Sequence, residues 1–403
     1  MPLPCFFLKI EKEKSILKKR HPWIFSNAMQ DHRGEVPEDG SMVDIFESDQ
    51  KTFFGRGYFN GKSQICVRIL TRDKNEKIDE AFFEKRFINL KKMRGSFINP
   101  SETNAYRLVF AESDGLAGLI VDRYDDVYVI QIHTLGMEQL KPLVVAALAK
   151  VLRPRAIYER SDSAARRQDG FSEKATGLLF GTLSSPHVTI RENGLLFTVD
   201  VINGQKTGFF LDQRENRAAI TKYVSGKHIL NCFSYTGGFS VYSAVAGALS
   251  VTSVDISEDA MQQARENFSL NGIPTEKHQF VVADAFKYFD QCRASGKTFD
   301  LIVLDPPAFA KNRHTLKSGL GGYLHINESA LRLLPVGGIL ASASCSAFVT
   351  DELFQKMLTL AARRAYCNLR VLEIRHQPID HPINLDFPEG KYLKFWICLK
   401  SEF

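Results

Sequence analysis

The second half of the chain alternates short apolar runs with segments in which apolar residues recur every three or four positions. Short apolar runs are typical of buried strands, and the second spacing is typical of helices that bury one face. From about residue 188 onward we therefore predict an α/β fold with a mostly parallel, doubly wound sheet and helices on both faces. Its seven predicted strands are 228–233, 251–255, 279–283, 301–305, 339–344, 369–374 and 392–399.

The first half divides into two smaller patterns. In residues 1–73, apolar stretches at 42–46, 53–54 and 65–70 alternate with glycine-containing turns, which predicts a small β-barrel or sandwich. In the middle segment we predict a compact α+β unit with a charged helix, three strands, an amphipathic helix and a further strand, at 74–94, 106–111, 118–122, 127–132, 138–151 and through Ile157. The expected domains are 1–73, 74–187 and 188–403.

Composition narrows the class of protein. The 403 residues are 44% hydrophobic and 24% charged, which suits a globular chain with more than one core. The net charge of +6 is compatible with a polyanionic partner without identifying one. Seven cysteines without a Cys-x-x-Cys pair argue against a disulfide framework or a zinc site. No apolar stretch approaches the roughly 18 residues of a membrane helix, so we expect a cytoplasmic protein without metal or membrane partner.

A glycine turn follows the first strand of the predicted doubly wound sheet. In open α/β sheets, ligands bind at the carboxyl ends of the strands. Glycine lets the backbone approach a ligand closely, and the N-terminus of the following helix attracts polar groups. The turn lacks the G-x-G-x-x-G spacing of a dinucleotide site. The candidate cofactor-binding residues in this segment are Phe233, Tyr235, Gly237 and Gly238.

Acidic residues end the next three predicted strands. Asp255 follows the glycines by about 20 residues, the spacing at which an acid binds a ribose diol. Asp284 could accept a hydrogen bond from an adenine amino group, and Asp305 ends the third strand. The alternative for Asp255 and Asp284 is helix capping. Three acid-tipped strands in succession favour an adenosine-containing cofactor over unrelated caps.

A stiff loop and a cysteine complete the candidate reaction centre. Pro306 and Pro307 follow Asp305 directly, and two prolines fix the backbone and leave its carbonyls free for a substrate. Such a loop suits a site that holds a planar base. Cys345 leaves the same sheet edge just after the predicted strand 339–344, whereas the other six cysteines have the positions of buried apolar residues. Cys345 is therefore the candidate nucleophile, provided that its environment favours the thiolate.

Two basic clusters are candidate RNA contacts. Lys18, Lys19 and Arg20 belong to a lysine-rich stretch near the N-terminus, and Arg166 and Arg167 belong to an arginine cluster in the middle segment. Each cluster fits either a phosphate-binding surface or an ordinary solvated face.

The segment 204–208 lacks the Gly-Lys pair of a P-loop, which excludes a nucleotide triphosphatase of that kind. Asp212 with Glu215 has the spacing of a capping box.

With these residues in place, the chain resembles the bacterial large-subunit ribosomal RNA methyltransferase I family over nearly its whole length. Residues 21–25 and 55–60 resemble the family's N-terminal PUA domain, an RNA-binding barrel, and residues 112–124 resemble its middle domain. Four further motifs resemble its class I methyltransferase domain: Gln205 to Arg214, Asp305-Pro306-Pro307, Ser344-Cys345-Ser346 and Asp380-His381-Pro382.

The resemblance implies S-adenosylmethionine as cofactor and C5 of a cytosine in 23S ribosomal RNA as the methylated atom. It adds Arg56, in the PUA-like motif, to the candidate RNA contacts, together with Pro306 and Pro307 of the stiff loop. Cytosine C5 is a poor nucleophile, so a thiolate of Cys345 adding at C6 would activate it, with Asp305 holding the N3 edge. The base that removes the C5 proton is not identified; His381 is one candidate.

Two other functions remain open from the sequence. One is methylation of a base amino nitrogen, which also uses Asp-Pro-Pro loops, although there an aromatic residue follows the prolines, whereas Ala308 precedes Phe309 here. The other is a non-catalytic RNA-binding role in ribosome assembly. A homodimer is compatible with the sequence but is not indicated by any pattern in it.

Overall fold

The computed structural model describes residues 3–33, 35–162 and 165–402, and the chain divides into two compact units. Three segments form the first unit, namely Met1–Arg191, Val199–Leu211 and Ile379–Gly390. Three others form the second unit, namely Glu192–Thr198, Asp212–Pro378 and Lys391–Phe403. Short 3₁₀ helices occur at Ser26–Ala28, Ala111–Asp114, Leu211–Gln213, Thr221–Tyr223 and Pro388–Gly390.

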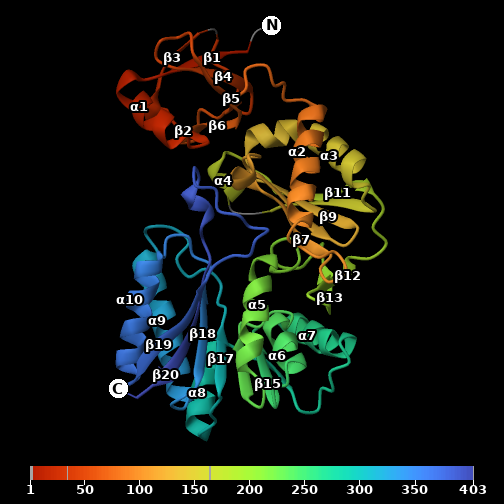
Figure 1. Cartoon of the computed structure of the whole chain (residues 1–403), viewed down its shortest axis with the longest axis vertical. Coiled ribbons are helices and arrows are strands. Elements are labelled where there is room, and N and C mark those ends of the chain that lie inside the picture. Colours follow the sequence, from red (N-terminus) through yellow and green to blue (C-terminus); the bar gives the residue numbers. More distant parts are fainter. Residues whose placement is uncertain (1–2, 34, 163–164, 403) are drawn as a thin grey trace. The chain divides into compact units, whose positions relative to one another are not determined.

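The N-terminal part of the first unit is a six-stranded sheet that curls around its own apolar core (Figure 1). The strand order is β2-β6-β5-β4-β1-β3, and Val43, Ile45 and Val67 are fully buried inside it. Helix α1 (Ile10–Lys19) follows the first strand. The strands are β1 (Cys5–Leu8), β2 (Trp23–Phe25), β3 (Met29–Arg33), β4 (Met42–Phe46), β5 (Phe53–Phe59) and β6 (Ile65–Thr71).

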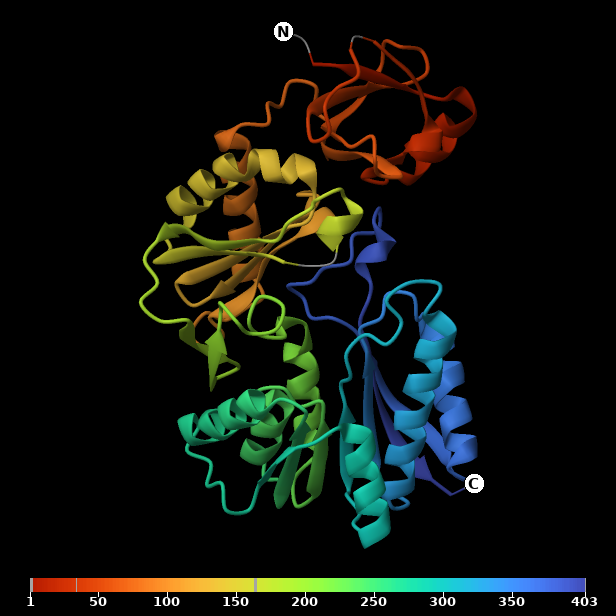
Figure 2. The ribbon, with the colours of Figure 1, turned by 180° about the vertical axis from the view of Figure 1, so that it is seen from behind.

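The rest of the first unit is built on a five-stranded sheet of order β11-β10-β9-β8-β7. Helices α2 (Glu80–Gly95) and α3 (Leu135–Leu152) pack against each other and on one face of this sheet (Figure 2). The other elements are β7 (Ala105–Phe110), β8 (Leu119–Tyr124), β9 (Val127–Ile132), β10 (Ala156–Ser161), α4 (Ala165–Gln168) and β11 (Ala175–Gly181). A separate two-stranded sheet pairs β12 (His187–Glu192) with β13 (Leu195–Asp200).

Two distant segments of the chain complete the first unit. The Thr207 hydroxyl donates a hydrogen bond of 2.6 Å to Asp122, and Asp380 accepts one of 2.9 Å from the backbone N–H of Arg107. His381 is buried beside Asp380 and packs against the ring of Phe110. The family resemblance assigns both motifs to the methyltransferase domain, whereas their contacts place Gln205–Leu211 and Asp380–Pro382 in the first unit. The predicted boundaries at residues 73 and 187 stay predictions.

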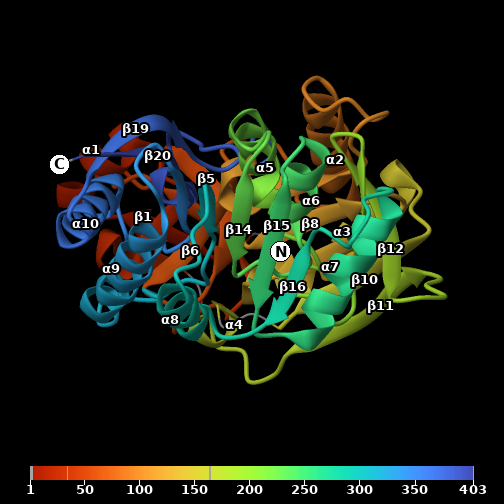
Figure 3. The same ribbon diagram turned by 90° about the horizontal axis from the view of Figure 1, so that it is seen from below.

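The second unit contains the predicted doubly wound sheet, in the order β16-β15-β14-β17-β18-β20-β19. Figure 3 shows β14, β15 and β16 side by side. Only β20 runs against its neighbours β18 and β19. The strands are β14 (His228–Cys232), β15 (Ser250–Asp255), β16 (Gln279–Val282), β17 (Leu301–Leu304), β18 (Ile339–Ser344), β19 (Asn368–Arg375) and β20 (Lys394–Ser401), so all seven lie where the sequence predicts them.

Helices cover both faces of this sheet, as predicted. One layer shares a core with the strands and consists of α8 (Ala285–Ser295), α9 (Leu316–Leu333) and α10 (Asp351–Arg364). The opposite layer consists of α5 (Arg214–Ile220), α6 (Gly238–Val245) and α7 (Glu258–Leu270). None of the helices in residues 3–33, 35–162 and 165–402 combines the length and the apolar character that crossing a membrane requires.

Local signals fix where these helices begin and end. Ser257 caps α7 by accepting from the N–H of Ala260. The helix ends at Leu270, with Asn271 as its C-cap, before Gly272, whose φ is +67°. The capping box expected at Asp212 is wrong. The residue before α5 is Gln213, whose side chain makes no capping bond, and Asp212 instead accepts a 2.6 Å bond from the hydroxyl of Tyr392.

Candidate active site

Five neighbouring parallel strands of the second unit end at the same edge of the sheet. Cys232 at the end of β14 pairs with Val254 of β15 and Leu304 of β17, and Leu304 pairs with Ser342 of β18. This register brings the residues that follow these strands to one edge, which is where an open α/β sheet binds its ligands. In strand order they are Asp284, Asp255, the loop from Phe233 to Gly238, Asp305 and Cys345.

The loop after β14 has an unusual backbone. Every second residue in it, namely Phe233, Tyr235 and Gly237, has a positive φ, of 58°, 47° and 80°. Left-handed conformations are unfavourable for bulky residues and occur mainly at functional sites, where the surrounding fold enforces them. Phe233 and Tyr235 are half-buried. The strain therefore supports the prediction that this loop belongs to a binding site.

The two glycines of this loop are needed for packing as well as for backbone conformation. A Cβ on Gly237 would lie 3.0 Å from the Cβ of Ala264 on α7, and one on Gly238 would lie 2.9 Å from the Cδ of Arg217 on α5. Arg217 is itself buried and forms an ion pair of 2.7 Å with Glu192. Close packing by neighbouring helices thus explains these glycines without a ligand, which the sequence argument did not foresee.

Asp255 connects the loop after β14 with the loop after its own strand. Its Oδ2 accepts from the N–H of Tyr235 at 2.9 Å, and its Oδ1 accepts from the N–H of Ser257 at 3.0 Å. The helix cap is Ser257, so the capping alternative for Asp255 does not hold. Each carboxylate oxygen keeps acceptor capacity for a ribose hydroxyl. Beside it, the side chain of Ile256 is 75% exposed, and sequence reasoning missed this apolar surface.

Asp284 has the structural role that the sequence left open. It is the N-cap of α8, and its Oδ1 accepts a 3.1 Å bond from the N–H of Lys287. A ligand contact by Asp284 stays a prediction.

Among the residues that the structure describes, no group of three histidine, cysteine or acidic side chains could hold a metal ion.

Asp305 is oriented by a glutamine that sequence reasoning missed. The side-chain amide of Gln213 donates a 2.9 Å bond to Oδ1 of Asp305, and the Oε1 of Gln213 accepts from Asn216 at 2.7 Å. Gln213 is only 2% exposed. Because this chain of bonds fixes the amide, the carboxylate of Asp305 is held in one orientation at the sheet edge. The only sequence signal for Gln213 was its place in the motif that ends at Arg214.

The loop that begins at Asp305 lies against Cys345. The sulfur of Cys345 is 3.9 Å from the carbonyl oxygen of Pro306. The hydroxyls of Ser346 and Tyr323 are 2.9 Å apart, and the N–H of Ala310 donates to Ser346 at 3.2 Å. The structure therefore brings the predicted loop and the predicted nucleophile together and ties both to α9.

Packing on α9 immobilises this loop further. The ring of Phe309 packs on the ring of Tyr323 with centroids 4.8 Å apart. Gly319 leaves room for the loop, because a Cβ there would lie 2.8 Å from the backbone nitrogen of Ala310. Phe309 is thus engaged with the protein core. The stiffness that two prolines predict is reinforced by contacts that the sequence does not reveal.

Cys345 differs from the other thiols in its exposure. Cys66, Cys232, Cys292, Cys367 and Cys398 are buried, and burial raises the pKa of each thiol, to about 11 for Cys66 and about 12 for Cys398. Apart from Cys345, the partly exposed cysteine is Cys5, on the first strand of the chain. Among the thiols of the second unit, partial exposure therefore belongs to Cys345, the one at the carboxyl edge of the sheet.

A buried lysine lies behind Cys345. Lys394 at the start of β20 pairs with Ser344 in the sheet and is 3% exposed. Its Nζ donates to the carbonyl oxygens of Ser346 and Tyr392, at 2.6 and 2.7 Å. Burial lowers the pKa of Lys394 to about 8, although Cys345 and Asp351 act in the opposite direction. Sequence reasoning treated this lysine as an ordinary strand residue.

The candidate RNA contacts fall into two groups. Lys18, Lys19, Arg20, Arg167 and Pro307 are exposed, so they are available to a ligand. Pro306 is buried. Arg56 forms a 2.7 Å ion pair with Asp44, and Arg166 is buried in a 3.0 Å ion pair with Glu138. Both of these arginines serve the first unit's own structure, and an RNA contact by either of them stays a prediction.

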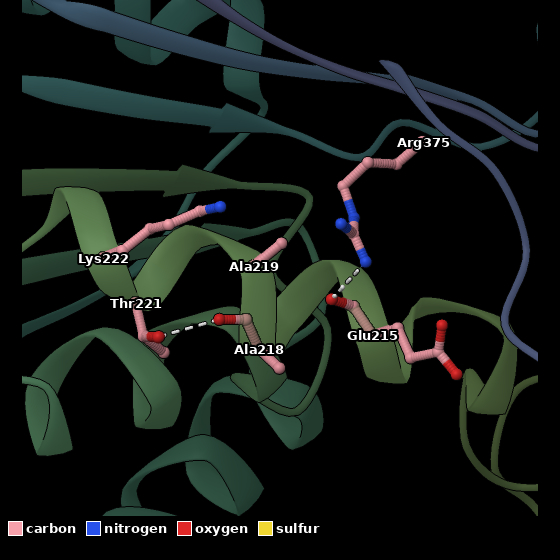
Figure 4. Close-up of a pocket in the computed structure, with 6 residues that line it drawn as sticks. All are labelled: Glu215, Ala218, Ala219, Thr221, Lys222 and Arg375. Carbon is pink, nitrogen blue, oxygen red and sulfur yellow. Dashed lines mark hydrogen bonds between the residues drawn. The ribbon is translucent and has the colours of Figure 1, made fainter. Parts of the chain in front are cut away.

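A shallow cavity of about 330 Å³ lies along α5. Figure 4 shows Lys222 and Arg375 among the residues that line it. Both cations are neutralised by Glu373, at 2.7 and 3.2 Å. The cavity contains none of the predicted site residues, and it does not change the choice of the sheet edge as the candidate site.

Comparison with known proteins decides the family. A family model for S-adenosylmethionine-dependent methyltransferases matches residues 168–389, and one for PUA-like domains matches residues 7–72. Ribosomal RNA large subunit methyltransferase I of Shewanella denitrificans is 46% identical over 387 residues, covering 96% of this chain and 97% of the relative. The protein of that name from Aeromonas salmonicida is 44% identical over 383 residues, covering 95% and 96%.

The chain belongs to the ribosomal RNA large subunit methyltransferase I family. Solved structures agree with this assignment. A putative SAM-dependent methyltransferase from Streptococcus mutans covers the whole of both chains with a TM-score of 0.83 at 25% identity. A putative methyltransferase complexed with SAH gives 0.84 at 26% identity, again over both whole chains. The predicted PUA-like domain, the methyltransferase fold and the cofactor S-adenosylmethionine are thereby confirmed.

The sheet edge fits this cofactor. Asp255 offers acceptors for a ribose, Ile256 offers an exposed apolar side chain, and the strained loop after β14 lies between them and Asp305. These groups match the diol, the flat base and the charged tail of an adenosyl methionine. The enzyme is thus a methyltransferase, and the contacts of these residues with the cofactor stay predictions that can be tested individually.

Proposed function

We propose that the enzyme methylates C5 of a cytosine in 23S ribosomal RNA through a covalent adduct with Cys345. The observation that carries this proposal is the contact between Cys345 and the loop that starts at Asp305, at the carboxyl edge of the sheet. The curated relatives, named as ribosomal RNA large subunit methyltransferases, support RNA of the large subunit as the substrate.

The chemistry explains why a thiol is needed at this place. Cytosine C5 is too weak a nucleophile to take a methyl group unaided. When the thiolate of Cys345 forms a bond to C6, the electron pair of the C5–C6 double bond moves toward N3 and makes C5 enamine-like. Bound S-adenosylmethionine supplies the methyl group. Loss of the C5 proton to a base then allows the thiolate to leave and restores the aromatic ring.

The remaining residues of the site hold the base in place. In this proposal the Asp305 carboxyl group faces the N3 edge of the cytosine, and Gln213 keeps it in that orientation. The carbonyl of Pro306 points to the region of Cys345, so the stiff loop positions the ring over the sulfur. Asp255 binds the ribose of the cofactor, Ile256 covers the adenine, Asp284 contacts its amino group, and the loop from Phe233 to Gly238 encloses the methionine part.

His381 loses support as the proton-removing base. Its side chain is buried in the first unit beside Asp380 and Phe110, where it packs as a structural group. The group that takes the C5 proton is therefore not assigned to a residue in this proposal.

Methylation of a base amino nitrogen is the competing reaction. That chemistry places an aromatic ring next to the Asp-Pro-Pro loop to stack on the substrate base. Phe309 is the available ring here, and it packs on Tyr323 and the core of the second unit. Its engagement supports carbon over nitrogen methylation.

Replacing the nucleophile separates the two reactions. We expect Cys345→Ala to bind S-adenosylmethionine normally but to transfer methyl groups to large-subunit RNA at least about a thousandfold more slowly. Tritium transfer from labelled cofactor measures the rate. Cys5→Ser, which changes the other partly exposed cysteine, is the matched control and should keep full activity. Full activity of Cys345→Ala would contradict the covalent mechanism.

A further inference from the structure

Lys394 is a buried cation whose position has no explanation in the proposed reaction so far. It is 3% exposed, and in the described part of the chain its Nζ forms no ion pair with a carboxylate. A buried ammonium without a carboxylate partner is unfavourable, so such a residue usually has a function. Its Nζ donates hydrogen bonds to two carbonyl oxygens, and one of them belongs to Ser346, the residue directly after Cys345.

The charged end of Lys394 lies beside the segment that contains Cys345. Lys394 pairs with Ser344 across β18 and β20, which places its side chain beside the end of β18, where Cys345 leaves the sheet. An ammonium group has three N–H donors, and two are used by the carbonyl oxygens of Ser346 and Tyr392. One donor is left for a further acceptor. A thiolate at Cys345 is such an acceptor.

We propose that Lys394 is the positioning residue that holds the Cys345 loop and stabilises the Cys345 thiolate, an inference that rests on the proposed covalent mechanism. When the amine of Lys394 and the sulfur of Cys345 together hold a single proton, that proton lies on Nζ and the sulfur carries the negative charge. Thiolate formation at the start of the reaction then releases the thiol proton to Nζ of a neutral amine, or to solvent when Nζ is already protonated. Thiolate and ammonium balance each other's charge in the buried space.

The titration behaviour of the amine supports this pairing. Burial lowers the pKa of Lys394 to about 8, and Cys345 is the first of the groups that raise it. The other charged groups near the pair are Asp351 and Lys391, which form an ion pair with each other. His376 lies 3.9 Å from Asp351, and Tyr323 faces Cys345 from α9. An ammonium group with a pKa of about 8 can release its proton near neutral pH, which suits a residue that exchanges a proton with a neighbouring thiol.

The test is the alkylation rate of Cys345 as a function of pH, which needs neither RNA nor cofactor. Isotope-coded iodoacetamide and mass spectrometry of the peptide that contains residue 345 give the rate at this cysteine alone. The midpoint of this pH profile is the pH at which the alkylation rate of Cys345 reaches half of its maximum. In wild type we expect it clearly below the ordinary pKa of a thiol, about 8.5. Lys394→Met should raise that midpoint by at least one unit and slow alkylation at pH 7 about tenfold, because only the thiolate reacts.

Two further variants keep the result interpretable. Lys391→Met removes a lysine three residues away, which is 38% exposed and paired with Asp351, and it should leave the midpoint unchanged. Lys394→Arg keeps the positive charge and should retain a low midpoint. A wild-type midpoint at or above 8.5 would overturn the proposal even if Lys394→Met fails to fold. Equal midpoints in wild type and a folded Lys394→Met protein would overturn it as well.

The outcome is separable from that of the covalent mechanism. A low midpoint of the alkylation profile that rises in Lys394→Met, together with full activity of Cys345→Ala, would support the interaction between Lys394 and Cys345 and refute the covalent adduct. Suppose instead that Cys345→Ala is inactive and that Lys394→Met does not change the midpoint of the alkylation profile. That result would support the covalent adduct and refute the interaction between Lys394 and Cys345.

Discussion

Asp255 shows how a single carboxylate can serve both the fold and a ligand. It accepts one backbone N–H from Tyr235 and one from Ser257, and thereby joins the loops that follow β14 and β15. Each of its oxygens keeps capacity to accept a further hydrogen bond. The same carboxylate organises the site through these two bonds, and its contact with the cofactor is the part of its role that we propose.

Asp255→Asn tests the ligand half of this role. The amide cannot accept at both atoms, and loss of a charged hydrogen bond weakens binding by about 1.5 to 3 kcal/mol, or roughly tenfold to a hundredfold in Kd. Calorimetry with S-adenosylmethionine measures the change. Glu258→Gln removes an exposed acid three residues away and is the control. Unchanged affinity in Asp255→Asn would make the residue purely structural, and no binding by wild type would favour the non-catalytic alternative.

At the scale of elements, the sequence predicts best what is buried in regular patterns. The strands β14 to β18 are short apolar runs between glycine turns and helix caps, and each lies within one or two residues of its predicted range. Helix α1 was missed, because none of its ten residues is buried and its many lysines leave no clear helical spacing of apolar residues. Strands β11 and β12 were also missed. β11 contains Gly177 and has no buried residue, and β12 has only two apolar residues, Val188 and Ile190.

The partners that shape the site are harder to foresee than the site itself. Asp305, Cys345 and Asp255 could be named from strand ends, because parallel strands deliver their carboxyl ends to one edge. Gln213 and Lys394 could not. The first is 92 residues from its partner Asp305 and the second is 48 from Ser346, so only the folded chain brings each pair together.

Helix α1 carries part of the candidate surface for RNA. Lys18 and Lys19 are exposed in its last turn. If both contact phosphates, Lys18→Gln/Lys19→Gln should weaken RNA binding and lower the slope of log K against log salt by about 1.5, at roughly 0.7 to 0.9 per contact. Filter binding across a salt series measures this slope. Lys91→Gln/Lys92→Gln makes the same charge change on α2, and an equal effect there would show that net charge alone is responsible.

At the scale of the whole molecule, the two units are interleaved along the chain. Residues 199–211 and 379–390 belong to the first unit, although each of these segments lies in the sequence between two segments of the second unit. Thr207 makes this visible, because its buried hydroxyl contacts both Asp122 and the hydroxyl of Tyr124, at 2.6 and 2.8 Å. Asp122 also pairs with Arg107 at 2.8 Å. A cut at a single position would therefore not yield either unit intact.

Thr207→Val tests whether this buried network belongs to the first unit alone. Removing the hydroxyl leaves Asp122 and Tyr124 with an unmet hydrogen bond, which should lower the stability of the first unit by about 1 to 3 kcal/mol. Urea unfolding followed by hydrogen exchange in β7 and β8 measures the loss. The affinity for S-adenosylmethionine should stay unchanged, and a parallel loss of affinity would contradict the division into two units.

The central claim is that this enzyme methylates cytosine C5 in 23S ribosomal RNA through Cys345. Mapping of 5-methylcytosine in that RNA, from cells that lack the protein and from the same cells supplied with wild type or Cys345→Ala, tests it most directly. The account predicts that one cytosine loses its methyl group without the protein, regains it with wild type and does not regain it with Cys345→Ala. An unchanged map in the absence of the protein, or full restoration by Cys345→Ala, would contradict it.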